Sequence, residues 1–226
     1  MQPYYDADGI TIYHGDCTKV DEWLAGDVLV TDPPYGIDYR SGARRSDETM
    51  LPRSIRGDQD TSTRDHALRR WSSTDELVEP PALVFGTWKR PAPEATVQVL
   101  VWDTGGANGM GNLSIPWKPS HQQVYVIGDG EWQGRRTTDV LRYPPVQSLA
   151  RNGRVHPHQK PVDLLVELID KCPPGVVVDP FMGSGSTLVA AKRCGRRAIG
   201  VELDEHYCEV AASRLAQGVL DFGGAA

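Results

Sequence analysis

Long apolar runs are scarce in this chain, which also lacks the signatures of several common protein classes. No apolar segment reaches membrane length and no charged-then-apolar leader is present, so we expect a soluble, cytoplasmic protein. The four cysteines stand apart, without zinc-like or redox spacing. We therefore expect reduced thiols and no bound metal.

Two nucleotide-binding fingerprints are missing as well. No G-x-x-x-x-G-K-[ST] run occurs, which excludes a P-loop. A glycine-rich turn at 181–185 begins with Phe181, and Leu188 stands where G-x-G-x-x-G requires a third glycine, which disfavours a nicotinamide oxidoreductase. At 226 residues, with 39% of them apolar, we predict one domain over 1–226.

The most informative segment that is present is VLVTDPPYG at 28–36, an apolar run followed by Asp32, Pro33, Pro34 and Tyr35. Asp32 offers a carboxylate acceptor, and the Pro33 carbonyl lacks a helical partner because another proline follows. Tyr35 adds an aromatic face for stacking. These groups suit a planar amino group on an extruded nucleobase, although a strand ending in a proline-stiffened turn is the simpler alternative.

A second segment, VVVDPFMGSGST at 176–187, is typical of a buried strand, a glycine-rich turn and a helix start. Gly183 and Gly185 let the main chain approach a ligand, and Ser186 and Thr187 suit the first turn of a helix. Glu202 ends the next predicted strand, 19 residues after Gly183. Carboxylates at about this offset of 20 residues bind ribose hydroxyls in doubly wound folds.

Together these motifs resemble those of DNA amino-methyltransferases, which methylate N6 of adenine or N4 of cytosine with S-adenosylmethionine as donor. The resemblance implies a catalytic role for Asp32, Pro33, Pro34 and Tyr35. It also implies donor-binding roles for Asp16, Cys17, Lys160, Asp179, Phe181, Gly183, Gly185, Ser186, Thr187 and Glu202. In that family Asp179 would face the methionyl end and Glu202 the ribose.

Two further segments fit the same resemblance. HPHQKP at 156–161 precedes a helical pattern, and Lys160 would lie near the methionyl carboxylate or the DNA. A structural or phosphate-facing role for its histidines is favoured over metal ligation. Gly15-Asp16-Cys17 resembles the turn beside the donor's adenine, with Asp16 accepting from the adenine amino group or simply forming a turn. In VQVLVWDTGGANGMGN at 97–112, Thr104 stands where the family commonly has lysine.

The order of these motifs matches the beta class of the family and implies an α/β, Rossmann-like methyltransferase fold with a permuted, seven-stranded, mostly parallel sheet. The first strand would lie at one edge, followed by the seventh, sixth, second and third strands and an antiparallel pair. The predicted strands, in chain order, are 10–13, 28–31, 82–85, 97–102, 123–127, 176–179 and 198–202.

Charge is unevenly distributed over this acidic chain, whose formal net charge is −6. Arginines are concentrated at 40–56 and basic residues at 133–160, and both windows suit DNA phosphates. We expect Arg44 and Arg45, in a mobile loop at about 41–65, and Arg135 and Arg136, in a short target-recognition insert at about 130–155, to contact double-stranded DNA. So short an insert leaves recognition to a few base pairs, to the 40–56 window as well, or to a second subunit in a homodimer.

Adenine N6 is the expected target, because the family associates a tetrapeptide headed by aspartate more often with adenine and one headed by serine with cytosine. N4-cytosine methylation stays an alternative, as does an inactive module that binds donor or DNA. Cytosine carbon-5 chemistry is disfavoured, because it requires a thiol nucleophile and none of the four cysteines follows a proline.

Overall fold

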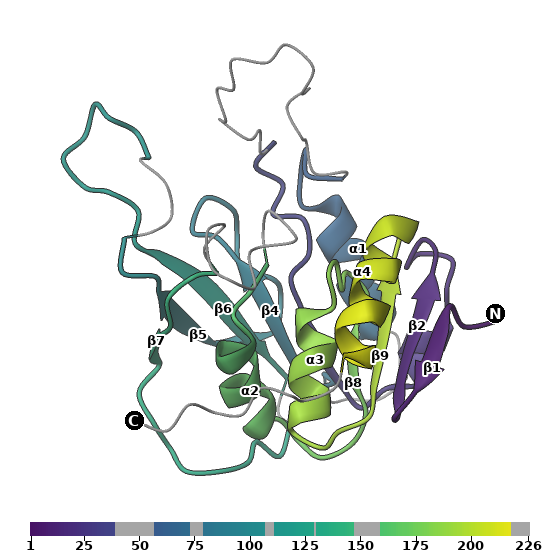
Figure 1. Cartoon of the computed structure of the whole chain (residues 1–226). Coiled ribbons are helices and arrows are strands. Elements are labelled where there is room, and N and C mark those ends of the chain that lie inside the picture. Colours follow the sequence, from purple (N-terminus) through teal and green to yellow (C-terminus); the bar gives the residue numbers. More distant parts are fainter. Residues whose placement is uncertain (39–56, 73–78, 107–110, 129, 147–158, 218–226) are drawn as a thin grey trace.

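The computed structural model describes residues 1–38, 57–72, 79–106, 111–128, 130–146 and 159–217 (Figure 1). Its nine strands are β1 (Tyr5–Ala7), β2 (Ile10–His14), β3 (Val28–Thr31), β4 (Ala82–Gly86), β5 (Thr96–Asp103), β6 (His121–Ile127), β7 (Val140–Arg142), β8 (Val177–Asp179) and β9 (Ala198–Glu202). Its helices are η1 (Glu22–Ala25), α1 (Ser62–Trp71), α2 (Val162–Asp170), α3 (Ser186–Arg193) and α4 (Glu205–Ala216).

All nine strands form one sheet in the order β1-β2-β9-β8-β3-β4-β6-β5-β7. Neighbours from β2 to β4 are parallel, whereas β6 runs antiparallel to both β4 and β5. The predicted spatial order of the seven strands and the Rossmann-like fold are therefore confirmed. Sequence reasoning missed the edge strands β1 and β7, which are three residues each and too short to show a periodic pattern.

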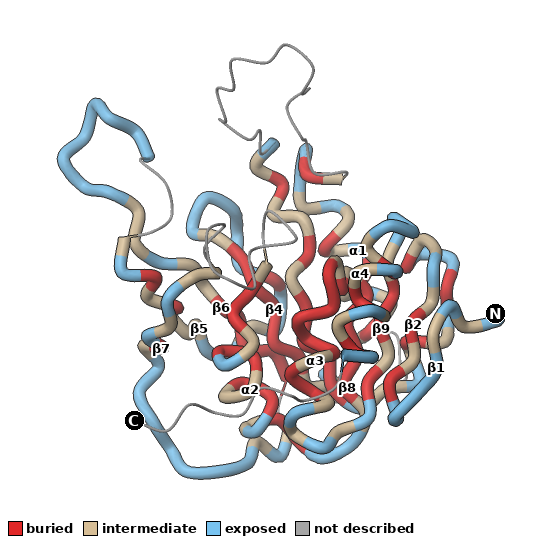
Figure 2. Tube along the Cα trace, viewed as in Figure 1, coloured by how far each residue is buried: buried red, intermediate tan, exposed pale blue. Residues whose placement is uncertain are grey.

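Successive side chains of the central strands point to opposite faces of the sheet, so the core has one part on each face. In β3, Val28 and Val30 pack with buried residues of α2, α3 and α4, whereas Leu29 packs with Trp23 of η1 and Trp71 of α1. Figure 1 shows α2, α3 and α4 side by side on one face of the sheet, and Figure 2 shows that the central strands are buried. Helices on both faces explain why these strands are apolar on both sides.

The structure adds secondary structure to two segments that were expected to be a loop and an insert. Helix α1 begins at Ser62, so the loop expected over 41–65 ends earlier than predicted, and residues 41–56 of it lie outside the described residues. The insert expected over 130–155 contains β7, which pairs in parallel with β5, and its residues 147–155 are likewise outside the described ranges. Among the helices described, none is long and apolar enough to cross a bilayer.

Candidate active site

The two principal motifs meet at the carboxyl ends of adjacent parallel strands. β3 pairs with β8 through Val28 with Val177 and Leu29 with Val178. At the ends of the two strands, Thr31 of β3 donates its hydroxyl to Asp179 Oδ1 of β8 at 2.6 Å. Asp32 and the glycine-rich turn therefore start from neighbouring strand ends, at the edge of the sheet where open α/β folds bind ligands.

A compact polar cluster forms around Asp32. Tyr35 donates its hydroxyl to Asp32 Oδ1 at 2.7 Å, and Lys160 Nζ donates to Asp32 Oδ2 at 2.5 Å. Lys160 Nζ also lies 3.1 Å from the Tyr35 hydroxyl, which is itself 3.1 Å from Gln122 Oε1 on β6. Burial and the adjacent Asp32 carboxylate hold the pKa of Tyr35 well above its usual value, so this hydroxyl keeps its proton.

Lys160 has a partner that the sequence did not indicate. We expected it near the methionyl carboxylate or the DNA, and the structure pairs its ammonium with the Asp32 carboxylate. Helix α2 starts at Val162, directly after Pro161, and the chain before it delivers Lys160 to the end of β3. No pattern in the sequence signals this contact, because 128 residues separate the two partners.

The turn after Tyr35 is held by two residues that sequence reasoning missed. Gly36, at φ 75°, donates its N–H to Asp58 Oδ1 at 2.6 Å. Its carbonyl accepts from Arg90 Nε at 2.7 Å. A Cβ at this position would lie 2.4 Å from the main chain of Asp60, so only glycine fits. Asp58 and Arg90 stand in polar loops without a motif, and the fold alone brings them together.

The glycine-rich turn is closed by Glu202 from β9. Gly183 N–H donates to Glu202 Oε2 at 2.9 Å, and Asp204 N–H donates to Oε1 at 2.9 Å. Gly185 has φ 77°, and a Cβ there would lie 2.8 Å from the Cβ of Ala211 in α4. Ser186 and Thr187 form the first turn of α3, as predicted, and both are buried. The Glu202 carboxylate and the N-terminal turn of α3 lie on the same edge of the sheet.

Asp179 is a buried carboxylate held at the start of this turn. It is 2% exposed, and Oδ1 accepts from both the Thr31 hydroxyl and the Phe181 N–H, the latter at 3.1 Å. Burial raises the pKa of Asp179 to about 6, although hydrogen bonds from Thr31, Thr187 and Phe181 oppose the rise. Burial also raises the pKa of Glu202. A ligand with a positive charge or hydroxyl groups would compensate for the lost solvation of these carboxylates.

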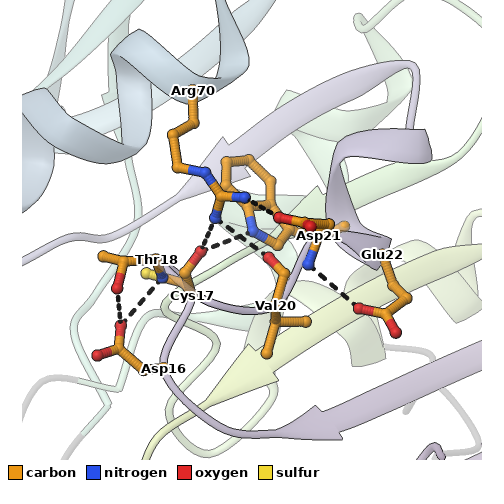
Figure 3. Close-up of polar contacts among 8 residues, drawn as sticks. Asp16, Cys17, Thr18, Val20, Asp21, Glu22 and Arg70 are labelled. Carbon is orange, nitrogen blue, oxygen red and sulfur yellow. Dashed lines mark hydrogen bonds and ion pairs between the residues drawn. The ribbon is translucent and has the colours of Figure 1, made fainter. Parts of the chain in front are cut away.

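The Asp16-Cys17 turn lies beside Glu202, because β2 pairs with β9 in parallel as far as His14 with Glu202. Figure 3 shows its anchoring: Asp16 Oδ1 accepts from Thr18 N and Oγ1, at 3.0 and 2.8 Å. Arg70 of α1 donates to the Cys17 carbonyl, which also accepts from Trp23 Nε1 at 3.0 Å. Asp16 therefore acts as a turn former in this structure, within a loop fixed next to Glu202.

Of the four arginines predicted to contact DNA, Arg135 and Arg136 are described, and they are not brought to this site. The main chain of Gln133 bonds to Lys171, and Lys171 Nζ donates to the Arg135 carbonyl at 2.9 Å. Lys171 lies at the far end of α2 from Lys160, so Arg135 and Arg136 lie at the amino-terminal edge of the parallel strands (Figure 1). Arg44 and Arg45 lie outside the described residues.

Comparisons with known proteins agree with this geometry. The model of the N6/N4 methyltransferase family, described as DNA methylase, matches residues 95–213. The putative methylase YubD of Escherichia coli (strain K12) is 32% identical over 89% of this chain and 88% of its own length. This chain belongs to the DNA amino-methyltransferase family. S-adenosylmethionine is therefore its methyl donor.

Solved structures confirm the fold of this methyltransferase. PvuII DNA methyltransferase (cytosine-N4-specific) superposes with a TM-score of 0.64 at 16% identity, over 99% of this chain and 91% of that one. The M1.HpyAVI–SAM complex gives 0.59 at 19% identity, over 91% and 99% of the two chains.

The residues present fit S-adenosylmethionine. Asp179 is a buried carboxylate that accepts hydrogen bonds from Thr31, Thr187 and Phe181, none of which carries a positive charge, and it suits the methionyl ammonium. Glu202 offers carboxylate oxygens to ribose hydroxyls. When bound, this donor supplies an electrophilic methyl group.

Proposed function

We propose that this methyltransferase transfers a methyl group to the exocyclic N6 amino group of adenine in double-stranded DNA, by direct transfer to an extruded base. The observation that carries the proposal is the placement of Asp32 beside Asp179, at the ends of the adjacent strands β3 and β8. An amino acceptor held by Asp32 would face a donor held by Asp179. The aspartate at the head of the tetrapeptide favours adenine.

The protein's own groups would act by alignment. Asp32 and the Pro33 carbonyl accept hydrogen bonds from the amino group, which orients the nitrogen lone pair towards the methyl carbon. The carboxylate also stabilises the positive charge that develops on this nitrogen. Tyr35 supplies a face for stacking, and base extrusion brings the amino group within reach. No covalent intermediate with the protein is required.

Cytosine N4 is the second candidate target. The observation in its favour is the structural likeness to the cytosine-N4-specific PvuII enzyme, which has the higher TM-score of the two structures compared above. Both amino groups are exocyclic, planar and bonded to an aromatic ring, so Asp32 and Pro33 could accept from either one. The reacting base therefore distinguishes two proposals that use the same residues.

One experiment tests both. Genomic DNA without prior methylation is treated with the protein and S-adenosylmethionine, digested to nucleosides and analysed by mass spectrometry. We expect N6-methyladenine, and sequencing of the modified positions gives the target site. N4-methylcytosine alone would replace the first proposal by the second, and no methylated nucleoside would contradict both. Size-exclusion chromatography with light scattering, with and without the mapped site, tests the predicted homodimer.

The assigned role of Asp32 gives a specific prediction. Replacing Asp32 by Ala removes the charged acceptor, so we expect the single-turnover rate to fall about 100-fold or more. Donor affinity, measured by calorimetry, should stay within about threefold, because Asp179 and Glu202 are unchanged. Asp139→Ala, at an exposed position before β7, is the matched control and should keep wild-type activity. A comparable rate in the Asp32 variant would disprove the role.

A further inference from the structure

The position of Lys160 has a consequence for how a base enters the site. Its side chain is 7% exposed, although lysine is almost never buried without a partner. The partner is Asp32, whose Oδ2 accepts from Lys160 Nζ at 2.5 Å. This is the carboxylate to which an incoming amino group must donate.

Both oxygens of Asp32 are engaged within the protein. Tyr35 holds Oδ1 through its hydroxyl at 2.7 Å, and Lys160 holds Oδ2. Each bond donates a proton to the carboxylate, as the target amino group would. Each oxygen keeps a second acceptor site, so a base can still donate to Asp32. Two internal donors already offset the charge of this carboxylate, however, so the new hydrogen bond is weakened unless one of them gives way.

Aromatic rings surround the ammonium on its other sides. Lys160 Nζ lies 4.9 Å from the ring centroid of Phe85, 5.5 Å from that of Tyr35 and 5.9 Å from that of Trp102. These are distances at which a cation is attracted to an aromatic face. The same rings would favour the positive charge that develops on a methylated amino nitrogen. The ammonium thus occupies an environment suited to the reacting nitrogen.

We propose that Lys160 is an internal substitute for the target amino group. Without DNA it holds Asp32 and Tyr35 in place, and it releases Asp32 Oδ2 when the base enters. Lys160 is therefore a positioning residue that also opposes base entry. This inference rests on the proposed amino-methyltransferase function, because only a donor of N–H bonds to Asp32 would compete with the ammonium.

Electrostatics require the release to be complete before transfer. The bound donor carries a sulfonium charge, and the amino nitrogen becomes cationic as the new bond forms. This is one positive charge, which passes from sulfur to nitrogen as the methyl group moves. A second cation at Asp32 Oδ2 would repel it and would compete for the acceptor that aligns the nitrogen. An amino group that donates hydrogen bonds to both the Asp32 oxygen and the Pro33 carbonyl compensates for the displaced ion pair. A base without an exocyclic amino group gains nothing from displacing it.

The test uses Lys160→Met, which keeps an unbranched stem against the rings and removes the charge, and Lys160→Arg, which keeps the charge. Lys192→Met is the matched control, because Lys192 also forms an ion pair, with Asp8 at 2.8 Å, and lies in α3 away from Asp32. For each protein the single-turnover rate, KM for a duplex with the mapped site and Kd for S-adenosylmethionine are measured. A duplex with 2-aminopurine at the target position reports base extrusion by fluorescence.

We expect the substitution to lower the KM for DNA without raising the single-turnover rate. In Lys160→Met, KM for DNA should fall about threefold or more and 2-aminopurine fluorescence should rise, because the competing donor is gone. The single-turnover rate should fall about tenfold, because the Tyr35 hydroxyl loses its 3.1 Å contact with Lys160 Nζ, which still positions Tyr35 after Asp32 is released. Lys160→Arg should restore part of the rate. Donor Kd should change by less than about twofold in all variants.

Other outcomes would overturn the inference. A higher donor Kd with unchanged KM for DNA would place Lys160 in the donor site, as the sequence first suggested. A higher KM for DNA with lower fluorescence would make it a DNA contact. Unchanged rate and KM would show that the ion pair has no role in turnover. The absence of methylation by the wild-type protein would contradict the proposed function itself, whereas these results concern Lys160 in an active enzyme.

Discussion

Asp179 has opposing effects on folding and on donor binding. Burial raises its pKa from an ordinary 3.8 to about 6, so the folded protein holds this proton more tightly than the unfolded chain does. Its contribution to stability is therefore present below pH 3.8 and is lost as pH rises towards 6. At neutral pH the ionised side chain costs about 3 kcal/mol, by the conversion of a shift of about two pKa units.

We predict that Asp179→Asn loses this pH dependence. Urea unfolding at pH 5 and pH 7.5 should show that wild type loses more stability on going to pH 7.5 than the variant does. The comparison between proteins removes the contributions of Glu202 and other groups that titrate in both. An identical pH dependence in the two proteins would show that Asp179 does not titrate in this window.

Donor binding should show the opposite dependence on the same proton. If the ionised Asp179 binds the methionyl ammonium, wild-type affinity for S-adenosylmethionine should rise about tenfold between pH 5 and pH 7. The Asn variant should bind weakly at both pH values, even where it is at least as stable as wild type. Calorimetry at the two pH values is the measurement. A pH-independent wild-type Kd would remove Asp179 from the methionyl subsite.

Among the individual residues of the site, the sequence identified those that stand in a motif. Asp32, Tyr35, Gly183 and Glu202 stand in local patterns whose spacing has a physical reason, and the structure brings all four to one edge. Lys160 was found as well, but its ion pair with Asp32 was not predicted. Its partner is decided by the path of the chain into α2, and no local pattern encodes that path.

Among the elements, helix α3 is bounded by two glycines whose surroundings differ. Gly185 and Gly195 precede and follow α3, and both have positive φ, at 77° and 67°. A Cβ at Gly185 would lie 2.8 Å from Ala211 of α4, whereas a Cβ at Gly195 meets nothing within 4 Å. The two positions share a backbone strain and differ in packing.

This difference predicts unequal effects of the same substitution. Gly195→Ala should lower the free energy of unfolding by about 1 kcal/mol, the usual cost of a left-handed conformation for alanine. Gly185→Ala should cost about 1–3 kcal/mol more, because α3 and α4 must move apart. It should also weaken donor binding, since α3 begins there. Urea unfolding and calorimetry measure both effects, and equal losses in the two variants would show that the contact with Ala211 relaxes freely.

In the molecule as a whole, the residues that we propose for methyl transfer lie at one edge of the sheet. The carboxyl ends of the parallel strands carry Asp32, Asp179 and Glu202, whereas Arg135 and Arg136 lie at the other edge. Charge in the sequence showed that these arginines were available for DNA. It could not show which edge they occupy, because that depends on the antiparallel direction of β6, which returns the chain to the amino-terminal edge.

We therefore predict that Arg135 and Arg136 are dispensable for methylation of short duplexes. The double substitution to Gln should leave kcat/KM within about twofold of wild type. Arg90→Gln should lower kcat/KM about tenfold, because the guanidinium binds the Gly36 carbonyl behind Tyr35. Steady-state kinetics at fixed ionic strength measure kcat/KM for the double variant and for Arg90→Gln. A tenfold loss in the double variant would mean that DNA wraps around to that edge.

The clamp on Gly36 separates chemistry from recognition. Asp58 and Arg90 hold the two peptide groups that flank Gly36, immediately after the Asp32–Tyr35 tetrapeptide. Substitutions between positions 39 and 56 would leave both of these clamping residues unchanged. Related enzymes can then diverge in target sequence while the residues of the methylation step stay the same.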